Sequence, residues 1–416
     1  MIVRQKRDLP QNKSQSSGFR LYFSVLDNKK DCFGFYQNGE LFYDSPPDDM
    51  RVTWKHSETL CAGAYEYCSV LARSDNLNDV CPPELSTEWH KVDSKLRAIK
   101  KSFATSMVDL NENCFFDMVK QQYLLDYFSV KEAIMKHVYE TTERTENFDF
   151  DCRMHEMLQE ISKKQIKLNS CFLRDNQHKL KVRTLSKKLK SIEPFAKYKQ
   201  FSTTTGRLTV EKDFFPIMTL DKDVRDVVLP DNDFIIELDY NAAELRVFLG
   251  LSGHEQPTGD LHKWNSTFLK TDRQQAKRSV IAYMYGGKSL GNGELEALYD
   301  VNVVKEKHYD PAKEEVKNPF GRKIKSDEFH AVNYTIQSTT AEIVFRNMLK
   351  IHELLKNRKS SVKFCLHDSI VLDFSNEDRD IIMEIKNIFS TTPFGSFPTR
   401  ISGGKTFGNM KEMRFD

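Results

Sequence analysis

The order of hydrophobic and polar residues divides the chain into three stretches with different periodicities. Residues 18–50 alternate apolar and polar positions around Asp27–Asn28 and Asn38–Gly39, which predicts a small antiparallel β-meander. From Glu84 to Phe195 the apolar residues recur every three or four positions, as they do on amphipathic helices. After Gly206, strand-like and helix-like segments alternate to the end. The pattern therefore predicts an α+β protein with a small β-containing lead, a helical arm and a mixed body.

The composition is that of a globular protein, with 416 residues of which 39% are hydrophobic and 29% charged. No apolar stretch approaches the length of a membrane span, and the polar, basic start lacks the apolar centre of a signal peptide. The eight cysteines show no zinc-binding spacing and predict reduced thiols. We therefore expect a cytoplasmic protein that is not secreted and has no membrane partner.

A dense block of basic residues ends the helical arm, although the net charge of the whole chain is only +2. Within the block only Asp175 and Glu193 carry negative charge. A solvated basic helix face would also produce this pattern, but a run this long with so few acids favours a polyanionic partner. The block consists of Lys163, Lys164, Lys167, Arg174, Lys179, Lys181, Arg183, Lys187, Lys188, Lys190, Lys197 and Lys199.

Two acids lie at a predicted junction between a strand and a helix. Phe234–Leu238 is an apolar run typical of a buried strand, and Ala243–Leu251 has the apolar spacing of a helix. Asp239 follows the strand and Glu244 opens the helix. An acid at the end of a strand is rigid enough to hold a metal ion. The alternative is an ordinary helix start, where acids favour the helix dipole.

A second pattern places two cations on one face of a predicted helix. Arg273, Lys277, Ile281 and Tyr285 recur at every fourth residue and therefore share that face. Two cations followed by an apolar and an aromatic residue can hold a triphosphate at one end and cover a base and sugar at the other. A surface helix with spaced basic residues is the alternative.

A third pattern consists of two strand-like runs within residues 362–374 that meet at His367–Asp368. This arrangement predicts a hairpin with an acid at its tip. Taken alone, this pattern is explained more simply by a plain turn. Together with Asp239, however, Asp368 completes a two-carboxylate site that suits two Mg²⁺ ions.

These three segments, in this order and spacing, resemble motifs A, B and C of the family A DNA polymerases, the family of bacterial DNA polymerase I. Two further segments agree. Thr205–Leu208 resembles the Thr-Gly-Arg-Leu element that precedes motif A, and Asn333–Glu342 resembles the helix before motif C. The resemblance is specific over residues 200–416 and extends to residues 90–200 only by position and charge.

The resemblance implies a right-hand polymerase fold with three parts. Residues 1–90 form a small lead of unknown function, residues 91–200 a helical and basic thumb, and residues 201–416 the palm and fingers. The fingers lie near residues 245–335. The implied form is compact and viral or phage-like, without an exonuclease domain.

The resemblance also implies roles for individual residues. Asp239 and Asp368 would hold the two Mg²⁺ ions together with the backbone carbonyl of Tyr240, and Lys277 would also protonate the leaving group. The nucleotide would be bound by Arg273, Lys277, Tyr285, Glu244, Ile281 and Tyr240. The DNA would be bound by Arg207, Gln337, Asn333 and His367, and by the thumb residues Lys187, Lys188 and Lys190. Asp260–His262 resembles an element of the fingers to which we assign no role.

Glu244 bears on the choice of sugar. In the family this Glu fills the space of a ribose 2′-hydroxyl and pairs with the Tyr at position 285, which argues for deoxynucleotides. Phage-type RNA polymerases share the palm but lack the Glu.

The sequence departs from the family pattern at three places. Ser369 stands where the family usually has Glu and Ile281 where it has Phe or Tyr, and both regions look like those of RNA polymerases. Phe214–Met218 lacks the usual Asn and Gln contacts to the template.

We therefore predict a template-directed DNA polymerase that adds deoxynucleotides to a primer 3′ end in viral or phage DNA replication. Residues 1–90 are too few for a proofreading exonuclease, so any exonuclease, helicase-primase or processivity factor is expected on separate chains. Two alternatives remain open. One is a single-subunit RNA polymerase or primer-synthesising enzyme on the same palm, and the other is a catalytically inactive nucleic-acid-binding subunit.

Overall fold

The computed structural model describes residues 22–27, 34–43, 51–57, 60, 65–110, 112–284 and 292–413. It divides into two compact units, Met1–Thr142 and Glu143–Asp416. Compact units and functional subdomains are different divisions of a chain, so the predicted subdomain boundaries at residues 90 and 200 stay predictions.

The first unit combines short strands with two long helices. The segment with alternating polarity forms an antiparallel sheet of β1 (Ser24–Val25), β2 (Phe35–Gln37) and β3 (Glu40–Phe42), and a parallel pair follows, β4 (Val52–Thr53) with β5 (Glu66–Tyr67). Its helices are α1 (Cys68–Leu71), α2 (Pro83–Thr105) and α3 (Gln121–Thr141), with 3-10 turns η1 (Leu77–Asp79) and η2 (Phe115–Asp117). Tyr36, Phe116 and Phe128 belong to the apolar core that joins sheet and helices.

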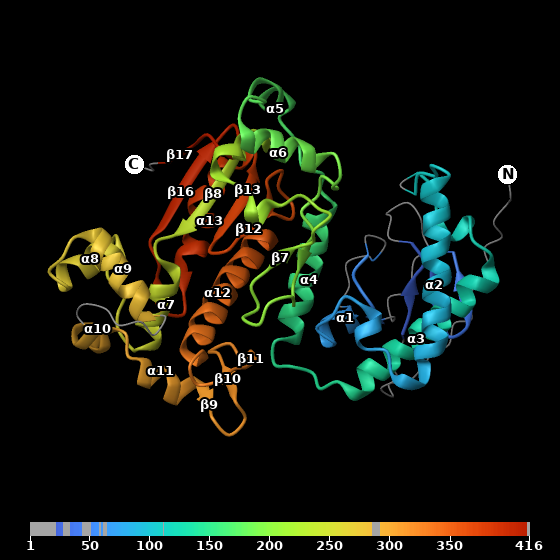
Figure 1. The fold of residues 1–416 in the computed structure, drawn as a ribbon, viewed down its shortest axis with the longest axis horizontal. Coiled ribbons are helices and arrows are strands. Elements are labelled where there is room, and N and C mark those ends of the chain that lie inside the picture. The colour runs from blue at the N-terminus through green and yellow to red at the C-terminus, as the bar shows by residue number, and fades with distance from the viewer. Residues whose placement is uncertain are drawn as a thin grey trace. The chain divides into compact units, whose positions relative to one another are not determined.

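The second unit is built on a five-stranded antiparallel sheet in the order β12-β13-β8-β16-β17 (Figure 1). The central strand β8 is flanked on both sides, and Ile235 and Leu238 within it are fully buried. Burial of Ile235, Ile236 and Leu238 explains the apolar residues in this run, whereas Glu237 and Asp239 are only partly buried. The strands are β8 (Phe234–Tyr240), β12 (Ser361–Leu366), β13 (Ser369–Phe374), β16 (Thr399–Gly404) and β17 (Met410–Glu412).

Two helices, α12 (Ala331–Leu355) and α13 (Ile382–Ser390), cover one face of this sheet. The ring of Tyr240 stacks on that of Phe389 in α13, with 4.1 Å between centroids, and the Asn347 amide of α12 donates to the Tyr240 hydroxyl at 3.0 Å. Because side chains alternate along a strand, Glu237 and Asp239 face the opposite side of the sheet from Tyr240. The face of β8 that carries Tyr240 therefore packs in the core, and the opposite face carries Glu237 and Asp239.

The chain leaves β8 through Ala242, whose φ of 55° lies in the left-handed region, and enters α7 (Ala243–Leu251). Arg246 in α7 is fully buried and donates to the carbonyl oxygens of Asn241, Pro257 and Gly259 at 2.8, 3.0 and 2.6 Å. It thereby ties the loop before the next helix to the turn after β8.

Figure 1 shows α8 to α11 grouped at one side of the second unit, with α5 and α6 elsewhere on it. These helices are α8 (Leu261–Phe268), α9 (Arg273–Met284), α10 (Asn292–Leu298) and α11 (Val301–His308), followed by the small sheet β9 (Tyr309–Asp310), β10 (Glu315–Lys317) and β11 (Lys323–Lys325). The unit begins with α4 (Phe148–Lys163), α5 (Ser170–Asp175) and α6 (Leu180–Leu189). Its minor elements are β6 (Tyr198–Lys199), β7 (Thr209–Val210), η3 (Ile217–Thr219), η4 (Lys222–Val227), η5 (Asn376–Ile381), β14 (Thr391–Thr392) and β15 (Gly395–Ser396).

Among the described residues, no helix combines the length and the apolar character that crossing a bilayer requires. The prediction that the cysteines are reduced is wrong for Cys114, which is disulfide-bonded, whereas Cys68, Cys81, Cys152, Cys171 and Cys365 are thiols. Disulfide formation depends on the distance between two thiols in the fold, which spacing along the sequence does not reveal.

Candidate active site

Two aspartates meet at the ends of neighbouring strands. Asp239 lies at the end of β8, and Asp368 lies in the turn between β12 and β13, where His367 has a φ of 52°. The register pairs Ser369, the first residue of β13, directly with Asp239. The hairpin therefore brings Asp368 next to the end of β8, although 128 residues lie between the two aspartates in the sequence.

The electrostatics of this pair favour a bound cation. Burial, the charge of Asp368 and the charge of Glu237 raise the pKa of Asp239 from 3.8 to about 6. Burial also raises the pKa of Asp368. Against this, Arg400 lies 3.4 Å from Asp239 and is 57% exposed, so it compensates the carboxylate only weakly. Two carboxylates in this situation are stabilised when a cation joins them.

The donors at this site are oxygen atoms, which hard divalent cations such as Mg²⁺ prefer. In the described part of the chain no three His, Cys, Asp or Glu side chains are placed to bind one ion together. Mg²⁺ is commonly held by one or two carboxylates, with water and substrate phosphates completing its coordination. Asp239, Asp368 and the backbone carbonyl of Tyr240 are oxygen donors of this kind. The Tyr240 side chain is engaged in the core by Asn347 and Phe389, and the role of its backbone carbonyl stays a prediction.

A pocket of about 380 Å³ lies beside the pair, and the predicted motifs converge on it. Glu244 comes from the segment after β8, Ile281 from α9, and His367 and Asp368 from the hairpin. The remaining lining residues are Arg207, Ala242, Ala243, Leu245, His262, Met284, Thr340 and Ala341. Segments that are far apart in the sequence therefore form one concave site.

Arg207 and Glu244, which the sequence assigned to DNA and to the sugar, form an ion pair in the pocket wall. The Arg207 guanidinium donates to the Glu244 carboxylate. The pairing of Glu244 with Tyr285 that the resemblance implies lies outside the described residues, because residue 285 does. The Glu244 carboxylate is therefore engaged by Arg207 in this structure.

The cations of α9 are exposed and a turn apart. Arg273 forms an ion pair with Asp260 at 2.8 Å, and this hydrogen bond lowers the pKa of Asp260 to about 2. Asp260 also caps α8 by accepting from the Lys263 amide at 2.8 Å. Lys277 is exposed on the next turn, and Ile281 reaches the pocket one turn later. The helix thus leads from two cations to the pocket, as the spacing predicted.

His262 is a pocket residue to which the sequence assigned no role. It is 9% exposed, lines the pocket, and its buried Nδ1 has no hydrogen-bond partner among the described residues. Burial and then the charge of Lys277 lower its pKa, so the imidazole is neutral at pH 7. The only sequence signal for it is its place two residues after Asp260.

The helix α12 carries the predicted DNA contacts toward the pocket. Gln337 donates to Asn333 at 2.9 Å, one helical turn away. Thr340 and Ala341, a further turn along, belong to the pocket wall. Residues four apart share a helix face, so Asn333 and Gln337 lie on the face that leads to the pocket.

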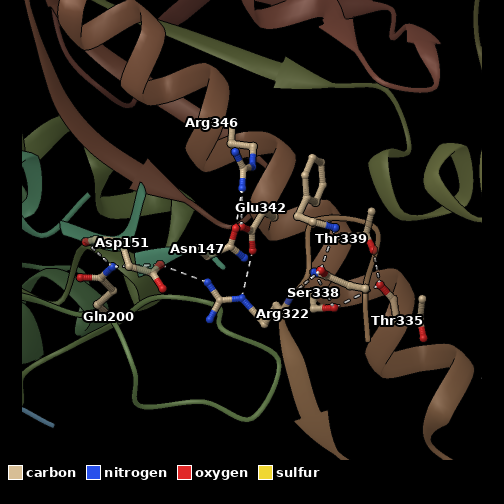
Figure 2. A network of polar contacts seen from close by, with 11 residues as sticks. Asn147, Asp151, Gln200, Arg322, Thr335, Ser338, Thr339, Glu342 and Arg346 are labelled. Atoms are coloured by element: carbon tan, nitrogen blue, oxygen red, sulfur yellow. Dashed lines mark hydrogen bonds and ion pairs between the residues drawn. The ribbon is translucent and has the colours of Figure 1, made fainter. Parts of the chain in front are cut away.

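A buried ionic network supports the loop that carries Arg207 (Figure 2). Figure 2 shows Arg322 between Asp151 of α4 and Glu342 of α12. The Arg322 guanidinium lies 3.4 Å from the Asp151 carboxylate and 3.0 Å from the Glu342 carboxylate. Glu342 also pairs with Arg346 at 3.1 Å, and Arg346 reaches Asn147 at 3.0 Å.

The network reaches the Arg207 loop through a glycine. A Cβ atom at Gly206 would lie 3.2 Å from the Arg322 guanidinium, and Gly206 has a φ of 79°. Only glycine adopts such a conformation without strain, and it also permits the close approach. Arg322 therefore supports the backbone immediately before Arg207.

The basic block is less uniformly positive in the fold than in the sequence. Lys181 pairs with Asp221 and Asp223 at 2.8 and 2.7 Å, and Lys197 pairs with Glu211 at 3.4 Å. These acids lie outside the block. Lys187, Lys188 and Lys190, at the end of α6, are exposed, and no ion pair involves them within the described ranges.

No protein-family model matches the chain. The DNA polymerase of Mycobacterium phage L5 is 25% identical over 167 residues, which covers 33% of this chain and 28% of that protein's length. Among solved structures, the POL domain of Pol1 from M. smegmatis, in complex with DNA primer-template and dNTP, has a TM-score of 0.63 and 11% sequence identity. That match covers 94% of this chain and 96% of the other. The chain therefore has the right-hand fold of the polymerase domain of family A DNA polymerases.

Proposed function

We propose that the protein is a template-directed DNA polymerase that extends a primer with deoxynucleotides. The observation that carries this proposal is the pocket in which Glu244, Ile281 and Asp368, from three separate motifs, converge. The similar proteins support it, because one is a phage DNA polymerase and the other a polymerase domain bound to primer-template and dNTP.

In this proposal the side chains of the site have separate roles. Asp239 and Asp368 would hold two Mg²⁺ ions, whose contribution when bound would be activation of the primer 3′-hydroxyl and compensation of the charge on the leaving pyrophosphate. Arg273 and Lys277 bind the triphosphate, for which Arg273 exchanges its exposed ion pair with Asp260 for phosphate oxygens. Lys277 holds the proton that the leaving group takes up. Arg207, Asn333, Gln337 and His367 contact the primer-template.

Primer extension with the purified protein tests the proposal. A labelled primer-template is incubated with Mg²⁺ and either deoxynucleotides or ribonucleotides. We expect extension with deoxynucleotides that depends on the template base. Equal or better extension with ribonucleotides would instead support the RNA polymerase alternative, and tight binding of the primer-template without extension by either would support the inactive subunit.

Glu244 is expected to set the sugar preference. Replacing Glu244 with Ala opens the pocket wall and frees Arg207, so the preference for deoxynucleotides should fall at least about tenfold. Single-nucleotide incorporation, with kcat/KM measured for a matched pair of sugars, gives this ratio. Glu255→Ala removes an exposed acid from the same region and serves as the control. An unchanged ratio in the Glu244 variant would remove this residue from sugar selection.

The lysines at the end of α6 are expected to bind DNA phosphates. Replacing Lys187, Lys188 and Lys190 with Ala should reduce the slope of log K against log salt by up to roughly 2.7, since each phosphate contact contributes about 0.9. Primer-template binding measured by fluorescence anisotropy over a salt series gives the slope. Lys181→Ala is the matched control, because Asp221 and Asp223 already neutralise that lysine. The same slope in all three proteins would place the DNA elsewhere.

A further inference from the structure

A third carboxylate lies beside the aspartate pair, on the same face of β8. Glu237 precedes Asp239 by two residues, and side chains two apart on a strand point to the same face. The register sets Ser369 opposite Asp239 and Val371 opposite Glu237. The Ser369 hydroxyl lies 3.1 Å from Glu237 Oε1 and 3.2 Å from the carbonyl oxygen of Leu366, so its single proton is donated to either of these acceptors. The hydroxyl thus joins Glu237 to the strand that begins right after Asp368.

The charge around these three acids is poorly compensated. Arg400 at 3.4 Å from Asp239 is largely exposed, and it is the one ion pair that the described residues supply to Glu237, Asp239 or Asp368. His367, Arg207 and Lys222 act on the aspartates without forming an ion pair with them among the described residues, and Arg207 is already paired with Glu244. Glu237 itself is half-buried. Three acids and one exposed guanidinium leave a site with excess negative charge, and a divalent cation would relieve this excess.

We propose that Glu237 is a positioning residue for the divalent cations of this site: its carboxylate, oriented by Ser369, strengthens cation binding at Asp239 and Asp368. This inference rests on the proposed polymerase function. Glu237 acts through its charge, which adds to the charges of Asp239 and Asp368. Such residues beside the direct ligands commonly change metal affinity by an order of magnitude.

The arrangement also accounts for the departure at position 369. Where the family usually has Glu after the His-Asp pair, this chain has a serine that hydrogen-bonds a glutamate of the neighbouring strand. The third carboxylate beside the aspartate pair therefore comes from β8 instead of β13. Exchanging the two residue types between the strands should then preserve the charge of the site.

Cation binding to the full chain, without DNA or nucleotide, tests this inference independently of catalysis. Free Mn²⁺ is measured by electron paramagnetic resonance while the protein is titrated. We expect roughly tenfold weaker Mn²⁺ binding for Glu237→Gln than for the wild type. Glu412→Gln, an exposed change on β17 of the same sheet, should bind as the wild type does. Equal affinity of the Glu237 variant and the wild type, or no Mn²⁺ binding by the wild type, would overturn the inference.

A double variant separates charge from structural damage. Glu237→Ser combined with Ser369→Glu keeps three carboxylates, and we expect both Mn²⁺ affinity and the Mg²⁺ concentration for half-maximal primer extension to return toward the wild-type values. Failure of the double variant to recover, with an unchanged thermal midpoint, would also contradict the proposal. Wild-type protein that shows the expected Mn²⁺ pattern but extends no primer would instead contradict the polymerase function.

Discussion

Replacing Asp239 or Asp368 with Asn is expected to reduce primer extension by at least roughly a thousandfold, which corresponds to about 4 kcal/mol of lost transition-state stabilisation. The reason is that the amide cannot supply the negative charge that the cations of the site require. Single-turnover incorporation on a saturating primer-template measures the effect. The primer-template affinity should change little, since Arg207, Gln337 and the lysines of α6 are untouched.

The same variants should not be less stable than the wild type at neutral pH. The pKa of Asp239 is raised from 3.8 to about 6, so the folded protein resists the ionisation of this group. As the pH rises from 4 to 6, the Asp239 carboxyl loses its proton in the unfolded chain before it does so in the folded protein. The free energy of unfolding therefore falls as the pH rises through this window.

At pH 7 without divalent cations, the Asn variants carry no ionised carboxylate at the substituted position. They should therefore melt at the same temperature as the wild type or higher. Scanning fluorimetry is the check. A variant that loses activity and also melts at a lower temperature would point to damage of the fold, and one that retains most of its activity would remove that aspartate from the chemistry.

Replacing Glu342 with Gln is expected to destabilise the second unit by about 3–5 kcal/mol, which is the usual effect of removing one partner from a buried ion pair. Glu342 is 1% exposed and pairs with both Arg322 and Arg346. Its neutralisation leaves Asp151, at 3.4 Å, as the remaining acid paired with the buried Arg322 guanidinium among the described residues. Because Arg322 also lies against Gly206, the Arg207 loop should loosen.

Denaturant titration followed by hydrogen exchange of α12 peptides measures this loss in the unit concerned. Glu353→Gln on the same helix is the matched control, because Glu353 is exposed and its pair with Lys356 lies at the surface. Surface changes of this kind usually stay within about 0.5 kcal/mol. A Glu342 variant as stable as the control would show that the network contributes no net stability.

The elements that hold the site could be predicted from the sequence because their signals are local. An apolar run ending in an acid predicts β8, four-residue spacing predicts α9, and two strand-like runs around His367 predict the hairpin. Each of these patterns depends on neighbours within a few residues, so no knowledge of the fold is required. The roles assigned to Arg273, Lys277 and Asp368 came from the resemblance and stay predictions.

Other features were out of reach because they join residues from distant parts of the chain. The pair of Arg207 with Glu244, the neutralisation of Lys181 and the position of His262 all depend on how segments pack. Glu237 is an intermediate case. Its spacing of two from Asp239 could have indicated a shared face, but its hydrogen bond to Ser369 depends on strand register.

By itself, then, the sequence determined which segments carry acids, cations and turns, because local periodicity and backbone preference act over a few residues. The tertiary structure alone decided which of these charges meet, which are neutralised and which remain without compensation. The physical reason is that electrostatic energy depends on distance and burial. Both are set by the register of β8 with β13 and by the packing of α12 on the sheet.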